Sequence, residues 1–301
     1  MSQSPSPVDV HDVPTIVEAE PVSISSGARL ILWLLVLVGL VFFVLSLNGP
    51  DPRKAWVAYH VNVTFFVAIS MAGAGFTAVF HICNAQWVRP IRRIFESFSA
   101  FLPLAILLFA IGYLGHTYIF EWAHVPAPGK ADWLTPQFVY GRNLLGLLLL
   151  AALIRKAVYL SLRRDIGAVR GGLTGVPESR RERWSNSRFD KFMVGWPSDA
   201  VSGLKEASDS LWILSPVIVM VYALVMTMFA FDMIMSVDFH WFSTLFGALY
   251  FMSAVYVAFA GVSMGLGLLR ELHPLFRAKI ERRTLHDHGK LLFGFGIFWA
   301  Y

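Results

Sequence analysis

The chain has 301 residues, of which 56% are hydrophobic and only 15% are charged, and its mean hydropathy is +0.59. This composition excludes one water-soluble core of that length and indicates an integral membrane protein. The net charge of +5 comes from basic residues clustered in particular loops, without interleaved exposed aromatics, so we predict topology signals and no nucleic-acid binding. Apolar runs of near-spanning length recur without strand-like alternation. The predicted fold class is therefore an all-α polytopic transmembrane helix bundle in a lipid bilayer.

Residues 1–27 are rich in Ser, Pro, Val and acids and contain no Lys or Arg, so they lack the basic region of a cleaved signal peptide. We predict a disordered cytoplasmic tail there and a transmembrane domain over residues 28–301. The predicted spans are residues 28–47, 57–83, 98–120, 139–162, 211–236 and 241–269, with a seventh apolar run at 291–301. That last run has about half the length of a span, so we expect a C-terminally truncated copy of a longer protein.

Arg and Lys are concentrated after the second, fourth and sixth predicted spans. Placing these loops inside the cell, including the long one at about 163–210, gives a multi-pass protein with a cytoplasmic N-terminus. The turn at 237–240 then faces outward. Arg142, in the first turn of the fourth span, is expected to extend toward the outer surface like other long basic side chains near span ends.

Five ionisable residues fall near one membrane depth on the outer side: His60, His116, Asp232, Asp238 and His240. One interpretation makes Asp238 and His240 solvated turn residues, with Asp232 satisfied by backbone or hydroxyl donors. The alternative is the outer mouth of a buried polar path for protons or a quinol head group, because carboxylates and imidazoles can accept and pass on protons. A third is a b-type haem between His60 and His116.

The run HDHGK, at the start of the seventh apolar stretch, places His286, Asp287, His288 and Lys290 on the inner side. It is either a hydrated helix start, a site of proton uptake or a docking point for a cytoplasmic partner. The single cysteine, Cys83, excludes a disulfide framework, a CxxCH haem attachment and a cysteine-ligated iron–sulfur cluster in this sequence. Gly261 and Gly265 form a GxxxG pattern that predicts a helix contact.

Three segments in this order resemble one family of membrane subunits. They are the run containing Trp87, Arg89, Pro90, Arg92 and Arg93, then MSVDFHWFSTLFG at Met235 to Gly247, then HDHGKLLFGFGIFWAY at His286 to Tyr301. The family is the NrfD-like (polysulfide reductase membrane subunit) superfamily, and within it the ActF subunits of alternative complex III. The resemblance implies about ten spans in two four-helix bundles, in a bacterial cytoplasmic (inner) membrane.

The resemblance also implies a respiratory quinol:cytochrome c oxidoreductase. Its partners would be a paralogous NrfD-like membrane subunit that oxidises quinol, an iron–sulfur subunit and c-type cytochrome subunits that carry haem c. A subunit like this chain would bind none of those redox cofactors, although quinol or quinone binding is possible, and would support proton conduction and assembly. The family pattern marks Asp232, Asp238 and His240 outside and His286, Asp287 and Lys290 inside, with Arg89 and Arg93 structural. Direct quinol binding is the alternative, and a secondary transporter or inert scaffold is the alternative of another class.

Overall fold

A computed structural model describes residues 25–126, 128–173, 178, 191, 193–238, 240–272, 276–277 and 280–301. Nearly all of the predicted tail, much of the long basic loop and Phe239 of the predicted outer turn lie outside the described residues. The longer helices are α1 Ser26–Leu47, α2 Pro52–Ile82, α6 Pro136–Arg170, α9 Ala200–Met233, α10 Phe246–Leu272 and α12 Arg282–Ala300. Between α2 and α6 lie α3 Arg92–Ser97, α4 Leu102–Ile111 and α5 His116–Ile119.

Six helical segments of the described part are long and apolar enough to cross a membrane, which confirms the predicted all-α bundle. The third of them, Arg92–Ile119, is not one regular helix. The 3₁₀ segments η4 Phe98–Ala100 and η5 Gly112–Gly115 separate α3, α4 and α5. Pro103 stands just inside the first turn of α4, a position where its missing N–H removes no helical hydrogen bond.

Several helix boundaries differ from those of the predicted spans. Some helices extend into the polar residues beside an apolar run, and α10 starts later than predicted because a turn precedes it. α6 runs on to Arg170, and α9 starts at Ala200 because the Asp199 carboxylate accepts hydrogen bonds from the first-turn amides of that helix. α10 starts at Phe246 instead of residue 241, after a turn in which the Asp238 side chain binds the His240 amide. α12 starts at Arg282, so the HDHGK run lies within the helix.

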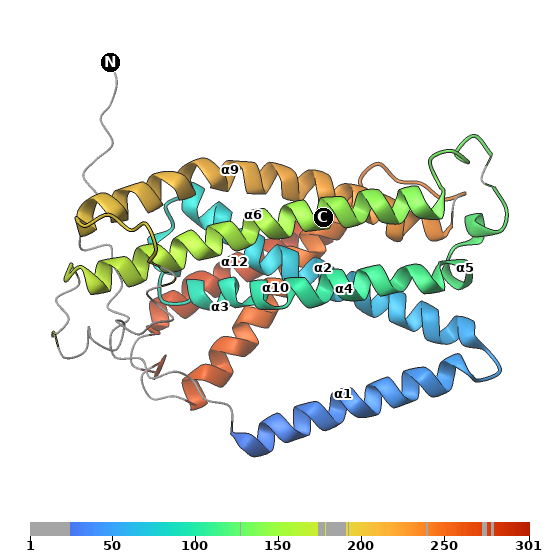
Figure 1. The fold of residues 1–301 in the computed structure, drawn as a ribbon, viewed down its shortest axis with the longest axis horizontal. Helices are drawn as coiled ribbons and strands as arrows, with labels where there is room; N and C mark the ends of the chain where they lie inside the picture. Colours follow the sequence, from blue (N-terminus) through green and yellow to red (C-terminus); the bar gives the residue numbers. More distant parts are fainter. Residues whose placement is uncertain are drawn as a thin grey trace.

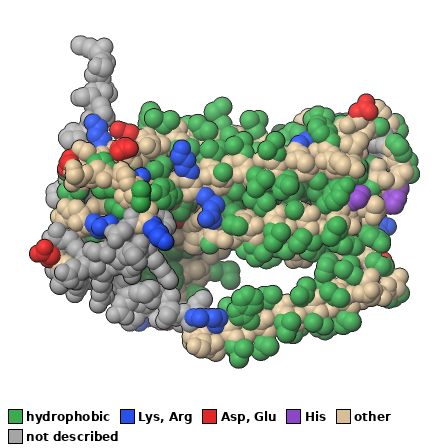
Figure 2. All heavy atoms as spheres, in the orientation of Figure 1, with side chains coloured by type: hydrophobic (Ala, Val, Ile, Leu, Met, Phe, Trp, Pro, Cys, Tyr) green, Lys and Arg blue, Asp and Glu red, His purple; other side chains and the backbone are tan. Residues whose placement is uncertain are grey.

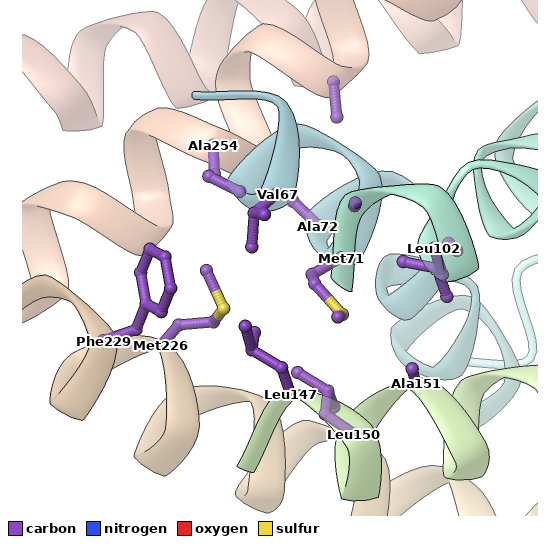
Figure 3. Packing of buried hydrophobic residues seen from close by; sticks show 14 of the residues in the cluster. Val67, Met71, Ala72, Leu102, Leu147, Leu150, Ala151, Met226, Phe229 and Ala254 are labelled. Atoms are coloured by element: carbon purple, nitrogen blue, oxygen red, sulfur yellow. The ribbon is translucent and has the colours of Figure 1, made fainter. Parts of the chain in front are cut away.

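Helix α2 is the centre of the fold, and α9, α10, α4, α6 and α1 pack around it (Figure 1). Of its apolar stretch, 72% is buried, more than in any other spanning helix described here. The small residues from Ala72 to Gly75 let neighbouring side chains approach: a Cβ at Gly73 would lie 2.7 Å from the Phe98 ring. Figure 3 shows the resulting core, where Val67 and Met71 of α2 face Leu147 of α6 and Met226 of α9.

The GxxxG pattern of α10 makes a helix contact within this chain, as predicted. Cβ atoms at Gly261 and Gly265 would lie 3.5 Å from Phe98 and Ile94, in the segment that begins with α3. The small-residue stripe therefore brings α10 against the first part of the bundle.

Most of the long helices run roughly along the long axis, with α10 inclined to it, and their connections gather at two ends (Figure 1). We call the end where α2, α6 and α10 finish the basic end, because most of the visible Lys and Arg side chains lie there, at the left of Figure 2. The other end, where α9 finishes, is called the Asp232 end. Helix α1 stands apart from the bundle with no buried residue, and contacts it through Phe43, whose ring lies 5.7 Å from that of Trp56.

Candidate functional site

The carboxylate of Asp232 is buried near the end of α9 and is held by three nitrogen donors of α6. Asp232 is 2% exposed. Arg142 Nε lies 2.7 Å from Oδ2 and Arg142 Nη2 lies 2.6 Å from Oδ1, a bidentate pair. Asn143 Nδ2 lies 2.6 Å from Oδ2. The charge of Asp232 is therefore compensated within the protein.

The expectation that Arg142 extends to the outer surface is wrong. Its guanidinium turns back into the bundle toward Asp232, because a carboxylate at the same depth on the neighbouring helix offers a charged partner. Its Nη1 also donates to the Trp133 carbonyl at 3.1 Å, and its Cζ lies 4.0 Å from the Trp133 ring centroid and 4.6 Å from that of Phe138. The pair thus ties the connection before α6 to the end of α9.

His60 and His116, two of the three histidines predicted near this depth, have separate partners. His60 Nε2 lies 2.7 Å from the Met233 carbonyl, one residue beyond Asp232, and its ring packs edge-on against Phe120. His116 Nδ1 lies 2.6 Å from the carbonyl of Tyr113 in its own segment, and its ring stacks on Tyr113. His60 therefore adjoins the Asp232 site, whereas His116 is engaged locally.

Asp238 and His240 are exposed and form a turn, with the Asp238 carboxylate 3.0 Å from the His240 amide. The turn interpretation given above agrees with this contact between Asp238 and His240. Its expectation that backbone or hydroxyl groups satisfy Asp232 is wrong, because the Arg142 and Asn143 side chains are the donors. Ser236, in the short 3₁₀ segment after α9, donates to the Asp232 carbonyl at 2.6 Å and accepts from Trp122 Nε1 at 3.2 Å. These contacts fix the backbone that carries Asp232.

A hollow of about 540 Å³ opens at the same end of the protein. Its lining includes the polar or charged residues Arg53, Thr117, Glu121 and His124, and the aromatic residue Phe120. Phe120 also contacts the His60 ring, so one aromatic side chain separates the hollow from the neighbourhood of Asp232. A space of this size is large enough for a small organic ligand.

The basic end contains a buried ion-pair network that no site prediction included. Its first centre is Asp165 of α6, which is 4% exposed. Arg92 Nη2 lies 2.9 Å from its Oδ2, Arg93 donates to the same oxygen, and Arg164 Nε lies 3.3 Å from Oδ1. Three guanidinium groups thus surround one carboxylate.

The second centre of the network is Glu96 of α3, which is also 4% exposed. It accepts a hydrogen bond from Arg93, and Ser161 Oγ of α6 donates to its Oε1 at 2.7 Å. Arg92 Nε lies 3.4 Å from the same oxygen and has no hydrogen-bond partner among the described residues. With Arg164 included, the network holds one more guanidinium than carboxylates and joins α3 to α6.

Sequence signals for this network exist. Arg92, Arg93 and Glu96 have the i, i+3 and i, i+4 spacing of a helical ion pair, and Asp165 follows two arginines at the same end of the next span. The expectation that Arg93 is structural agrees with its contacts here.

The HDHGK run places its residues on different sides of α12. His286 and Lys290 are exposed, and Lys290 Nζ lies 3.6 Å from the Asp287 carboxylate. His288, in contrast, is 2% exposed and faces α10. Of the four ionisable residues in the run, His288 is the one that the structure buries, whereas the family resemblance marks the other three.

Between the two ends, the core is filled with aliphatic and aromatic side chains such as Met71, Leu150 and Phe229 (Figure 3). The hydroxyl groups of Ser70 and Thr77 at this level bond carbonyls of their own helix. Among the described residues, the buried charged side chains therefore lie toward the two ends.

Within the described residues, no group of three or more His, Cys, Asp or Glu side chains is arranged to hold a metal ion. A scan against protein-family models finds no match to this chain, and a search of curated proteins finds no relative.

Proposed function

We propose that this chain is an integral membrane subunit of a respiratory quinol:electron-acceptor oxidoreductase of the alternative complex III type, where it supports proton conduction and assembly. The sequence resemblance given above suggests the complex. The structural observation that carries the supporting role is the burial of ionisable groups at both ends of a bundle with an apolar middle. Charged groups in such places are expensive and are usually kept for a purpose.

On this proposal the basic end faces the cytoplasm of a bacterium and the Asp232 end faces outward, following the distribution of Lys and Arg. The partners are a paralogous NrfD-like subunit, an iron–sulfur subunit and c-type cytochromes. Haem c and iron–sulfur clusters would belong to those partners, because the chain itself offers one cysteine, Cys83, which is exposed.

The test is purification of the tagged full-length chain from its native membrane under mild conditions. The proposal expects haem c and iron–sulfur signals in the redox difference spectrum, with quinol-dependent reduction of an electron acceptor. A colourless protein purified alone, from membranes that retain the activity without it, would overturn the proposal and favour a transporter or a scaffold.

Direct quinol binding by this chain is the second candidate, favoured by the hollow at the Asp232 end. Its volume of about 540 Å³ and its lining by Arg53, Glu121 and Phe120 suit a ring with hydroxyl groups. A quinone analogue titrated into the purified chain without its paralog should bind, and Glu121→Gln should weaken that binding. Ser97→Ala, an exposed change at the basic end, is the matched control. Equal affinity in wild type and Glu121→Gln would remove this candidate.

A further inference from the structure

His288 lies between three helices and is out of contact with solvent. It is 2% exposed and sits about 9 Å along α12 from the first residue of that helix, Arg282. Its ring stacks on Phe259 of α10, with centroids 5.3 Å apart and an interplanar angle of 9°. The Phe95 ring of α3 lies 6.0 Å away. An imidazole in such a position is usually held by hydrogen bonds at both ring nitrogens.

Only one of the two ring nitrogens is bonded. Nε2 lies 3.1 Å from the Phe259 carbonyl oxygen and 3.0 Å from Ser263 Oγ. Nδ1 is buried and has no hydrogen-bond partner in the part of the chain that the structure describes.

The partners of Nε2 determine where the ring proton sits. A carbonyl oxygen can only accept, so the contact with Phe259 requires N–H at Nε2. The hydroxyl of Ser263 donates to the same carbonyl at 3.2 Å, which leaves its oxygen lone pairs for Nε2–H. In the neutral ring, Nδ1 therefore carries a bare lone pair: a buried base without a donor.

We propose that His288 is a proton-binding site, with Nδ1 as the atom that accepts the proton. This inference rests on the proposed role in proton conduction and names the residue that takes protons up at the basic end. The incoming proton forms one N–H bond at Nδ1 and breaks no bond of the protein. Nε2–H keeps its contact with Phe259, so the ring can gain and lose the proton without leaving its place.

The surroundings allow the bound proton to leave again. Arg92 and Glu96 lie on α3 with Phe95 and belong to the ion-pair network described above. Because that network contains three guanidinium groups and two carboxylates, its net positive charge disfavours a further cation nearby. On α12, the neighbouring Asp287 is paired with Lys290, and on α10 the contact residue Ser263 is uncharged. The face of the Phe259 ring stabilises the imidazolium by a cation–π contact.

The decisive experiment is nitrogen-15 NMR of the full-length chain with labelled histidine, in lipid nanodiscs. At alkaline pH, the resonances lost in His288→Gln should show one protonated and one bare nitrogen. On acidification the bare nitrogen should become protonated while the protein stays folded. Resonances of His288 that do not change over the accessible pH range would overturn the proposal and leave the residue a structural contact.

A second measurement follows proton flux across liposomes containing the chain, driven by a potassium diffusion potential. His288→Gln, whose amide can still donate to the Phe259 carbonyl, should lower the flux by roughly tenfold or more, as expected for a lost proton carrier. The matched control is Ser253→Ala, which removes another side-chain hydrogen bond between these two helices, from Trp299 Nε1 at 2.7 Å. Equal flux in wild type and His288→Gln would contradict the proposal.

The two proposals fail in different ways. Titration of Nδ1 in a chain that purifies without haem c or iron–sulfur clusters would refute the proposed complex and keep the proton site. An active complex that contains haem c and iron–sulfur clusters, but in which His288 never titrates, would refute the proton site and keep the proposed complex.

Discussion

The ion pair between Arg142 and Asp232 allows a quantitative prediction. Asp232→Asn keeps the shape of the side chain but removes its charge, and leaves a guanidinium with 14% exposure without its counter-charge. The asparagine offers one carbonyl oxygen where the carboxylate receives three N–H donors. Breaking a buried pair by removing one partner costs about 3–5 kcal/mol, so we expect the free energy of unfolding to fall by about that much.

A double-mutant cycle separates the pair from the contacts of each residue alone. Arg142→Met should destabilise the protein by a similar amount, because Asp232 would keep only Asn143 as a donor. The double variant with Arg142→Met and Asp232→Leu replaces both charges by apolar groups, which is often neutral or stabilising. It should recover most of the loss, except for the stacking of Arg142 on Trp133, which contributes about 0.5–2 kcal/mol.

The assay is equilibrium unfolding in mixed micelles, with rising denaturing detergent followed by far-UV circular dichroism and tryptophan fluorescence. A midpoint for Asp232→Asn equal to that of wild type would refute the ion-pair argument, as would a double variant that loses the sum of the single effects. The same variants serve the proposed function. If the Asp232→Asn variant assembles into the complex but translocates fewer protons, the result supports a proton path through Asp232. If the double variant has normal turnover, the Arg142–Asp232 pair has a structural role only.

Three further predictions address topology, packing and capping. Cys83, exposed at the basic end, should react with an impermeant maleimide in inside-out vesicles only, and labelling in right-side-out vesicles would invert the proposed orientation. Gly203→Val should displace the Trp196 ring, which lies 2.4 Å from the position of an added Cβ, and lower the melting temperature; an unchanged melting curve would refute this. The side-chain and backbone hydrogen bonds from Ser202 hold the pKa of Asp199 below its ordinary value of 3.8. Protection of the first-turn amides of α9 from hydrogen exchange should therefore be complete above pH 3.8 and should fall as the pH drops through the lowered pKa of Asp199. Protection that is equally strong in Asp199→Ala would contradict this.

The spans were predictable because a bilayer imposes a length and an apolar composition on each helix, and both are local properties of the sequence. The breaks inside the third span were not, because they follow from packing against α2, where Phe98 fills the space beside Gly73. The ends of α6 and α9 extend beyond the apolar runs because helix continues through polar residues once a cap such as Asp199 satisfies the first amides.

Side-chain partners were harder to predict than helices, since the Arg142–Asp232 pair joins residues that are 90 positions apart. The sequence contained a usable signal, because both residues fall at the same end of two spans that run in opposite directions. Considered without a partner, a long basic side chain near a span end is expected at the surface, which is why the expectation for Arg142 is wrong. In a membrane-embedded bundle, opposite charges at equal depth on neighbouring spans should be tested as pairs first, because pairing lowers the cost of both.

The two ends of the bundle differ in what a proton would have to displace. At the Asp232 end, both carboxylate oxygens accept hydrogen bonds from nitrogen donors, so protonation there removes the charge that strengthens the bonds from Arg142. In the described part of the basic end, Nδ1 of His288 is buried, basic and without a donor, so protonation breaks nothing. On the proposed function, uptake at His288 therefore displaces no hydrogen bond of the described residues, whereas a proton that binds Asp232 weakens its ion pair with Arg142.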